Sequence, residues 1–219
     1  MIELISFLLL ALVLGFKHSY DPDHLIAVSN ILRKVDSVKL AAKIGLNWAI
    51  GHMLTATIIT ILLFIFKESI SSNILQHFEK VVGVMLIILG IISLKSILNF
   101  HSHRHKHDGI VHSHPHLHVK DKNNHSHAHM FGIGIIHGLA SNDEILILLT
   151  ASLAVTSLGG LLVGLGFFSI GVVLGMIFFA MIFSFPLIKL NSDKIYMAVS
   201  LITGSTGIAY GALMLFAVV

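Results

Sequence analysis

The chain has 219 residues, a mean hydropathy of +0.90 and only 11% charged residues, well below the roughly 25% of a soluble domain. These values exclude an ordinary soluble protein and predict a polytopic membrane protein with one transporter domain over residues 1–219. The formal charge of +3 requires no nucleic acid, because the basic residues fall in short connections between apolar segments. The sequence has no cysteine, which excludes disulfides and thiolate metal sites.

Six apolar segments follow one another, and we expect each to be helical because a bilayer offers backbone groups no other partner. They cover roughly residues 2–32, 41–66, 78–98, 130–155, 158–187 and 195–219. The first is too long for one straight crossing of about 20 residues. Pro22 lacks an amide hydrogen, so we predict that this helix is broken near residues 20–22. Its start carries Glu3 and no basic leader, which favours a retained span over a removed signal peptide.

Residues 101–129 interrupt this pattern, with a histidine at nearly every second position in two stretches. The segment has no sustained apolar face, so we expect a flexible loop. Closely spaced imidazoles bind divalent metals weakly, and a low-complexity linker without a metal role is the alternative.

The basic residues predict how the chain is oriented. They concentrate in the connections after the first, third and fifth segments (Arg33, Lys34, Lys39, Lys43; Arg104, Lys106, Lys120, Lys122; Lys189, Lys194). The positive-inside rule places these connections in the cytoplasm and both termini outside. We therefore expect a multi-pass protein of the cell membrane with a cytoplasmic histidine-rich loop.

A weak internal repeat is also present. His18-x-x-x-x-Asp23-His24 corresponds to His137-x-x-x-x-Asn142-Asp143, and Gly90-Ile91 corresponds to Gly207-Ile208. With three spans in each half, the second copy would be inverted in the membrane, as in many secondary transporters. Chance similarity between apolar helices is the alternative.

Four ionisable residues lie within seven positions of the first segment: His18, Asp21, Asp23 and His24. An aspartate at the centre of a membrane helix costs roughly 2.5–3.5 kcal/mol, so these groups should face the protein interior or a wet cavity. On an ideal helix His18, Asp21 and His24 share one face, with Asp23 opposite unless the break turns it inward. Imidazole and carboxylate together suit a divalent transition metal, whereas caps and hydrogen bonds around a kink are the structural alternative.

Residues 17–28, KHSYDPDHLIAV, resemble the His-x-x-x-x-Asp-His signature of the nickel/cobalt transporter family. The resemblance implies a permease for Ni²⁺ or Co²⁺ in which His18, Asp23 and His24 are needed for transport. Asp21 matches the first acid of the family's core. The family's second motif, Gly-His, matches Gly51-His52, and the resemblance implies that His52 is a ligand or a gate.

The fourth segment resembles the His-Gly-Leu-Ala stretch of the six-span relatives, beginning at His137. The following Asn142, Asp143 and Glu144 depart from the small residues expected there. We leave three roles open for them: completing the metal site, carrying protons, or capping a second broken helix.

The sequence thus predicts an all-α permease of about six transmembrane helices in two inverted three-helix repeats. It would bind Ni²⁺ or Co²⁺ between spans one, two and four and move it by alternating access. His18, His24 and His52 would supply nitrogen ligands, and Asp23, with Asp21 or Asp143 as a further candidate, would supply oxygen ligands or charge compensation. The metal is cargo, so we expect neither a resident cofactor nor enzymatic activity. No Walker sequence is present, and ligand histidines must shed protons, so proton antiport or the membrane potential is the expected energy source.

Uptake is favoured over efflux, which is the first alternative. A membrane haem protein with paired histidine ligands is the alternative of another class. The membrane component of an energy-coupling-factor importer would need partner subunits, and the Met1-Ile2 start does not resemble the Met-His of its nickel-binding members. The expected partners are the metal ion and the lipid bilayer, with a cytoplasmic metallochaperone or further copies of the chain as candidates.

Overall fold

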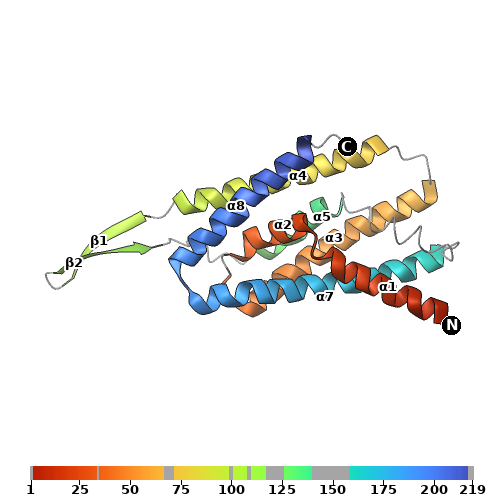
Figure 1. The fold of residues 1–219 in the computed structure, drawn as a ribbon, viewed down its shortest axis with the longest axis horizontal. Helices are drawn as coiled ribbons and strands as arrows, with labels where there is room; N and C mark the ends of the chain where they lie inside the picture. The colour runs from red at the N-terminus through yellow and green to blue at the C-terminus, as the bar shows by residue number, and fades with distance from the viewer. Residues whose placement is uncertain are drawn as a thin grey trace.

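The protein is described by a computed structural model that covers residues 2–33, 35–66, 72–98, 101–107, 110–116, 126–139 and 158–216. The elements in chain order are α1 (Ile2–His18), α2 (Pro22–Leu32), α3 (Val38–Phe66), α4 (Ser72–Leu98), β1 (His101–His107), β2 (Ile110–His116), α5 (Ser126–His137), α7 (Leu158–Leu190) and α8 (Asp193–Phe216). The long helices form an elongated bundle, and the β1–β2 hairpin projects from one end (Figure 1).

The helices have the length and composition of membrane spans. Within the described residues α3, α4, α7 and α8 each qualify as a span, and the pair formed by α1 and α2 makes a fifth if it is counted as one bent span. Large apolar side chains such as Val13, Ile58 and Phe178 are exposed on the outer faces, where lipid would cover them. The predicted all-α polytopic fold is confirmed. Of the expected span over residues 130–155, only the part up to Leu139 lies within the described residues.

The first segment is broken where proline predicted it. α1 ends at His18, and α2 begins at Pro22 with a bend of 54° between the two helices. Pro22 occupies the first turn of α2, where its missing amide hydrogen removes no helical bond. The break places the last residue of α1 and the first residues of α2 at the same level of the bundle, which brings their polar side chains together.

The packing repeats between the two halves of the chain. α1 packs on α7 as α5 packs on α3, while α4 packs on α8 and α3 on α7. The two matching pairs cross at glycines in equivalent places. A Cβ atom on Gly15 would lie 2.0 Å from the carbonyl oxygen of Phe168, and one on Gly134 would lie 2.2 Å from that of Trp48. Gly15 precedes His18 by three residues, as Gly134 precedes His137, so this packing follows the repeat seen in the sequence.

The histidine-rich segment differs from the loop that we expected. β1 and β2 pair in antiparallel register, with His103 opposite His114, and α5 begins at Ser126, so residues 126–129 are helical. Composition alone indicated a loop because the segment lacks an apolar face, but alternation with a period of two is also compatible with paired strands. The cytoplasmic location of this segment stays a prediction.

Candidate metal centre

Four histidines from four helices meet in the interior of the bundle. His18 ends α1, His24 lies in the first turn of α2, His52 lies in the middle of α3 and His137 ends α5. Their exposed fractions are 4%, 1%, 0% and 0%, respectively. The structure therefore brings together the histidines predicted from the first, second and fourth spans.

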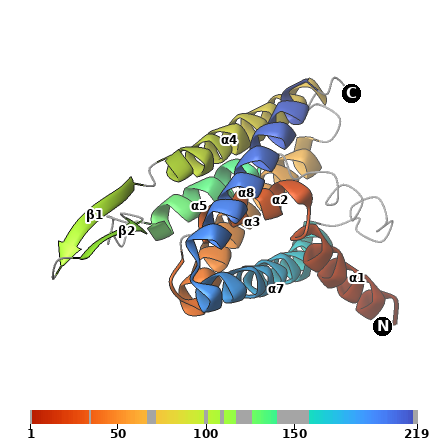
Figure 2. The ribbon, with the colours of Figure 1, turned by 60° about the vertical axis from the view of Figure 1, so that its left-hand side comes forward.

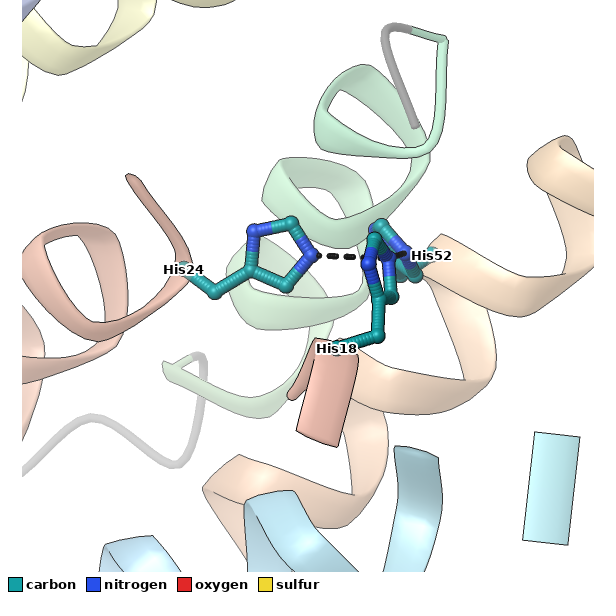
Figure 3. A group of neighbouring side chains, drawn as sticks. All are labelled: His18, His24 and His52. Atoms are coloured by element: carbon teal, nitrogen blue, oxygen red, sulfur yellow. Dashed lines mark hydrogen bonds between the residues drawn. The ribbon is translucent and has the colours of Figure 1, made fainter. Parts of the chain in front are cut away.

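Three of these rings point at one another, as Figure 3 shows for His18, His24 and His52. His18 Nε2 lies 3.2 Å from His24 Nε2 and 3.3 Å from His52 Nε2. We call these three residues the histidine trio. A metal–imidazole bond of about 2.0–2.1 Å places neighbouring ligand nitrogens about 2.8–3.0 Å apart in octahedral geometry and about 3.3–3.4 Å apart in tetrahedral geometry. The His18–His24 and His18–His52 spacings thus match those of ligands around one ion, and the three ligand atoms all lie within 4.8 Å of one another.

The aspartates lie behind the histidines of the trio. Asp23 Oδ1 lies 2.9 Å from His24 Nδ1 and accepts the His24 backbone amide at 3.0 Å, while Asp21 Oδ2 lies 2.9 Å from His18 Nδ1. A carboxylate accepts hydrogen bonds, so Asp23 holds the ring proton of His24 on Nδ1 and leaves His24 Nε2 as a lone pair. This lone pair faces His18 Nε2 at 3.2 Å, where it can accept the ring proton of His18 or bind a cation.

Asp23 also links the two halves of the chain. Its Oδ2 accepts a hydrogen bond from His137 Nε2 at 2.8 Å. Asp23, His24 and His137 therefore form a second group whose ligand atoms lie close enough to hold one ion. We had expected Asp23 and Asp21 as oxygen ligands or charge compensation, and the geometry gives both a role in orienting histidines, with direct ligation open to Asp23 in the second group.

An aromatic wall that our sequence reasoning missed surrounds the trio. Trp48 stacks on His52, with ring centroids 4.8 Å apart and an interplanar angle of 14°, and it also contacts the edge of His24. Phe168 of α7 lies 5.4 Å from His18. Trp48 is the sole tryptophan of the sequence and precedes His52 by one helical turn. This spacing could have predicted that the two side chains lie on the same face of the helix. The wall keeps the rings dry and fixes their orientation.

Several polar atoms of the centre have no partner within the described residues. His52 Nδ1, His137 Nδ1 and Trp48 Nε1 are buried without a hydrogen bond. Buried polar groups left unpaired cost about 1–3 kcal/mol each, so such a site favours an occupant. The predicted residues Asn142, Asp143 and Glu144 lie outside the described residues.

Comparison with known proteins identifies the family. Residues 25–213 match the family described as the cytochrome c biogenesis protein transmembrane region. The urease accessory protein UreH of Bacillus sp. (strain TB-90) is 33% identical over 211 residues, covering 96% of this chain and 90% of the relative. The chain belongs to this transmembrane-region family and is a relative of UreH. No solved structure matches the chain.

Membership of the nickel/cobalt transporter family, predicted from residues 17–28, is thereby confirmed. The UreH relative is named as an accessory protein, not as a catalyst. The name of the wider family does not transfer chemistry to this member, because one membrane fold can carry several functions. This family member has no cysteine, so any function of the wider family that depends on thiols is closed to these 219 residues.

Proposed function

We propose that the protein carries Ni²⁺ or Co²⁺ across the membrane and binds the ion at the histidine trio. The observation that supports this most strongly is the convergence of three Nε2 atoms, from α1, α2 and α3, at ligand spacing in a buried place. Neutral imidazole suits first-row divalent metals, and the positions left open on the ion would be filled by water, His137 or a carboxylate oxygen.

Alternating access would use the two halves of the bundle. The trio belongs entirely to the first half, and the Asp23–His137 hydrogen bond of 2.8 Å joins it to the second half. Separation of the halves would break this bond and open the site to one side, while closure would restore it. The paired crossings of α1 with α7 and α5 with α3 give the halves similar contact surfaces, which favours rocking around a central site.

The test is transport of radioactive nickel or cobalt into sealed vesicles that contain the purified protein, with the pH gradient controlled. We expect metal-dependent accumulation that is lost in His52→Ala, because this change removes one nitrogen of the trio. Accumulation of radioactive nickel in expressing cells then gives direction: more metal in the cells means uptake, which we propose, and less means efflux. Equal flux with and without the protein would overturn the proposed function.

The hairpin is a second place where we propose that metal binds. Three histidine pairs lie opposite each other in the register: His101 with His116, His103 with His114, and His105 with His112. Residues directly opposite in an antiparallel pair share a face of the sheet. The three pairs therefore occupy one face, and Arg104 and Lys106 occupy the other. This alternation separates the histidine positions from the fixed positive charges.

Metal binding by the hairpin can be tested by moving histidines from one face of the hairpin to the other without changing its amino-acid composition. The variant S102H/H103S/R104H/H105R moves two histidines of β1 to the opposite face and breaks two of the three pairs. In a His24→Ala background that weakens the membrane centre, we expect the number of Ni²⁺ ions that the hairpin binds, measured by calorimetry, to fall from three to one, because only His101 and His116 still face each other. The control S102R/R104S exchanges two residues on the other face and should bind as the parent does. Equal binding by both variants would show that the segment chelates without pairing.

A further inference from the structure

Arg33 is a buried cation that has no acidic partner within the described residues. It follows α2, is 7% exposed, and its Nε donates to the carbonyl oxygen of Asn30 at 2.8 Å. Its Nη1 donates to Ser96 Oγ at 2.7 Å, to Ser200 Oγ at 3.4 Å and to the hydroxyl of Tyr196. A buried charge is normally paired with an opposite one. Within the described part of the chain only neutral oxygen atoms, one carbonyl and three hydroxyls, accept hydrogen bonds from this guanidinium, so no opposite charge lies beside it.

A line of buried polar groups leads from Arg33 into the bundle between α2, α4 and α8. Asn30 Nδ2 donates to the carbonyl oxygen of Thr203 at 3.1 Å, while Asn30 Oδ1 is buried without a partner. Ser93 Oγ donates to the carbonyl oxygen of Ser200 at 3.1 Å and lies 3.4 Å from Thr203 Oγ1. We call Asn30, Ser93, Ser200 and Thr203 the polar seam. These four side chains are all buried.

The other end of the polar seam approaches the metal centre. Asn30 and Asp23 are seven residues apart on α2, which corresponds to about 10 Å along a helix. On α8, Tyr210 lies two turns beyond Thr203 and packs against the buried cluster that contains Ala27 of α2. In the stretch between, the small residues Ala27 of α2 and Gly207 of α8 are buried against Leu86 of α4. α2 lies beside both α4 and α8 (Figure 2), so one continuous interface joins the centre to Arg33.

We propose that the polar seam is the path of the metal cation between the centre and the end of the bundle that carries Arg33, and that Arg33 closes this path. The inference rests on the proposed function. Hydroxyl and amide oxygens replace part of the hydration shell of a cation, and Asn30 Oδ1 is an acceptor that no protein group uses. A fixed guanidinium repels a divalent ion at the mouth. Opening would break the hydrogen bonds of Arg33 to α4 and α8 together, so the mouth would behave as a two-state gate.

The absence of cysteine makes a direct test possible. Single variants Ser93→Cys and Thr203→Cys place one thiol in the seam, and Ser184→Cys places an equally buried thiol on α7, away from the seam. Each is combined with native Arg33 or with Arg33→Gln and treated with a small cationic methanethiosulfonate reagent. Losing hydrogen bonds to a charged group shifts an opening equilibrium by about 10- to 100-fold. We expect both seam thiols to react faster by this factor in Arg33→Gln, with the Ser184→Cys rate unchanged.

Two outcomes would overturn the inference: seam thiols that react equally with and without Arg33, or a parallel rise at Ser184→Cys, which would show general loosening. If Arg33→Gln does not fold, Tyr196→Phe removes one hydroxyl that holds Arg33 and should give a smaller rise confined to the seam. The thiol reaction requires no metal. A gated seam in a protein that transports no nickel or cobalt would therefore refute the proposed function and leave Arg33 as a gate for another solute.

Discussion

Replacing His24 with alanine is expected to weaken Ni²⁺ binding at the membrane centre by about a hundredfold, the upper end of what perturbing a metal site's support typically costs. His24 is the residue that the two candidate groups share: its Nε2 belongs to the histidine trio, and its Nδ1 is held by Asp23. His24→Ala therefore damages whichever group holds the ion. Equilibrium dialysis with Ni²⁺ measures the effect in a protein whose hairpin histidines are changed to serine, so that the hairpin does not contribute to the binding.

His129→Ala is the matched control for this measurement. His129 lies on α5, as His137 does, but it is exposed and belongs to neither candidate group. We expect its affinity to equal that of the parent. Retained binding in His24→Ala, or an equal loss in both variants, would show that the ion is not held where the rings converge.

The metal centre could be predicted from the sequence because the ionisable residues that are costly to bury in a membrane lie close together in one apolar segment. Two histidines and two aspartates in an apolar segment need a reason, and the chain itself shows them to be neighbours. The orientation of Asp23 could not be predicted in this way. A continuous helix places Asp23 opposite the face that His18, Asp21 and His24 share. The break at residues 19–21 restarts the helix, and Asp23 then contacts both its neighbour His24 and His137.

Other features depend on contacts that a linear pattern does not contain. In the sequence, Arg33 indicates only the cytoplasmic end of a span. The structure shows that it is buried, because α4 and α8 pack against it. Trp48 reads as an ordinary apolar residue until the stack on His52 is seen. The hairpin requires the pairing of two strands whose composition resembles that of a linker.

The repeat was visible in the sequence but compatible with chance. The glycine contacts in the structure support the repeat. Gly134 packs against the backbone of Trp48 on α3, and Gly15 packs in the same way against the backbone of Phe168 on α7. Both contacts bring backbone against backbone, the arrangement that small residues permit in membrane helices. Both also fix a residue of the centre, since Gly134 lies one turn before His137 and Gly15 one turn before His18.

These crossings should therefore be intolerant of a single methyl group. A Cβ atom on Gly134 would lie 2.2 Å from Trp48 O and 3.0 Å from His52 N, so Gly134→Ala must push α5 away from α3. Overpacking of this kind costs about 1–3 kcal/mol. Gly132 on the same helix has nothing within 4 Å, so Gly132→Ala should instead gain up to about 1 kcal/mol of helix propensity.

Thermal unfolding in detergent and Ni²⁺ affinity distinguish Gly134→Ala from Gly132→Ala, because the two variants should change the apparent Tm in opposite directions. We expect Gly134→Ala to lower the apparent Tm and to weaken Ni²⁺ binding, because the displaced helix carries His137 away from Asp23 and disturbs His52. Gly132→Ala should keep or raise both quantities. The same contrast is expected at the matching crossing of α1 with α7, where Gly171 would place a Cβ atom 2.2 Å from Leu12 O and Gly166 of the same helix meets nothing within 4 Å. Equal behaviour of Gly134→Ala and Gly132→Ala would mean that the halves do not meet at these crossings, and the link between packing and metal binding would be lost.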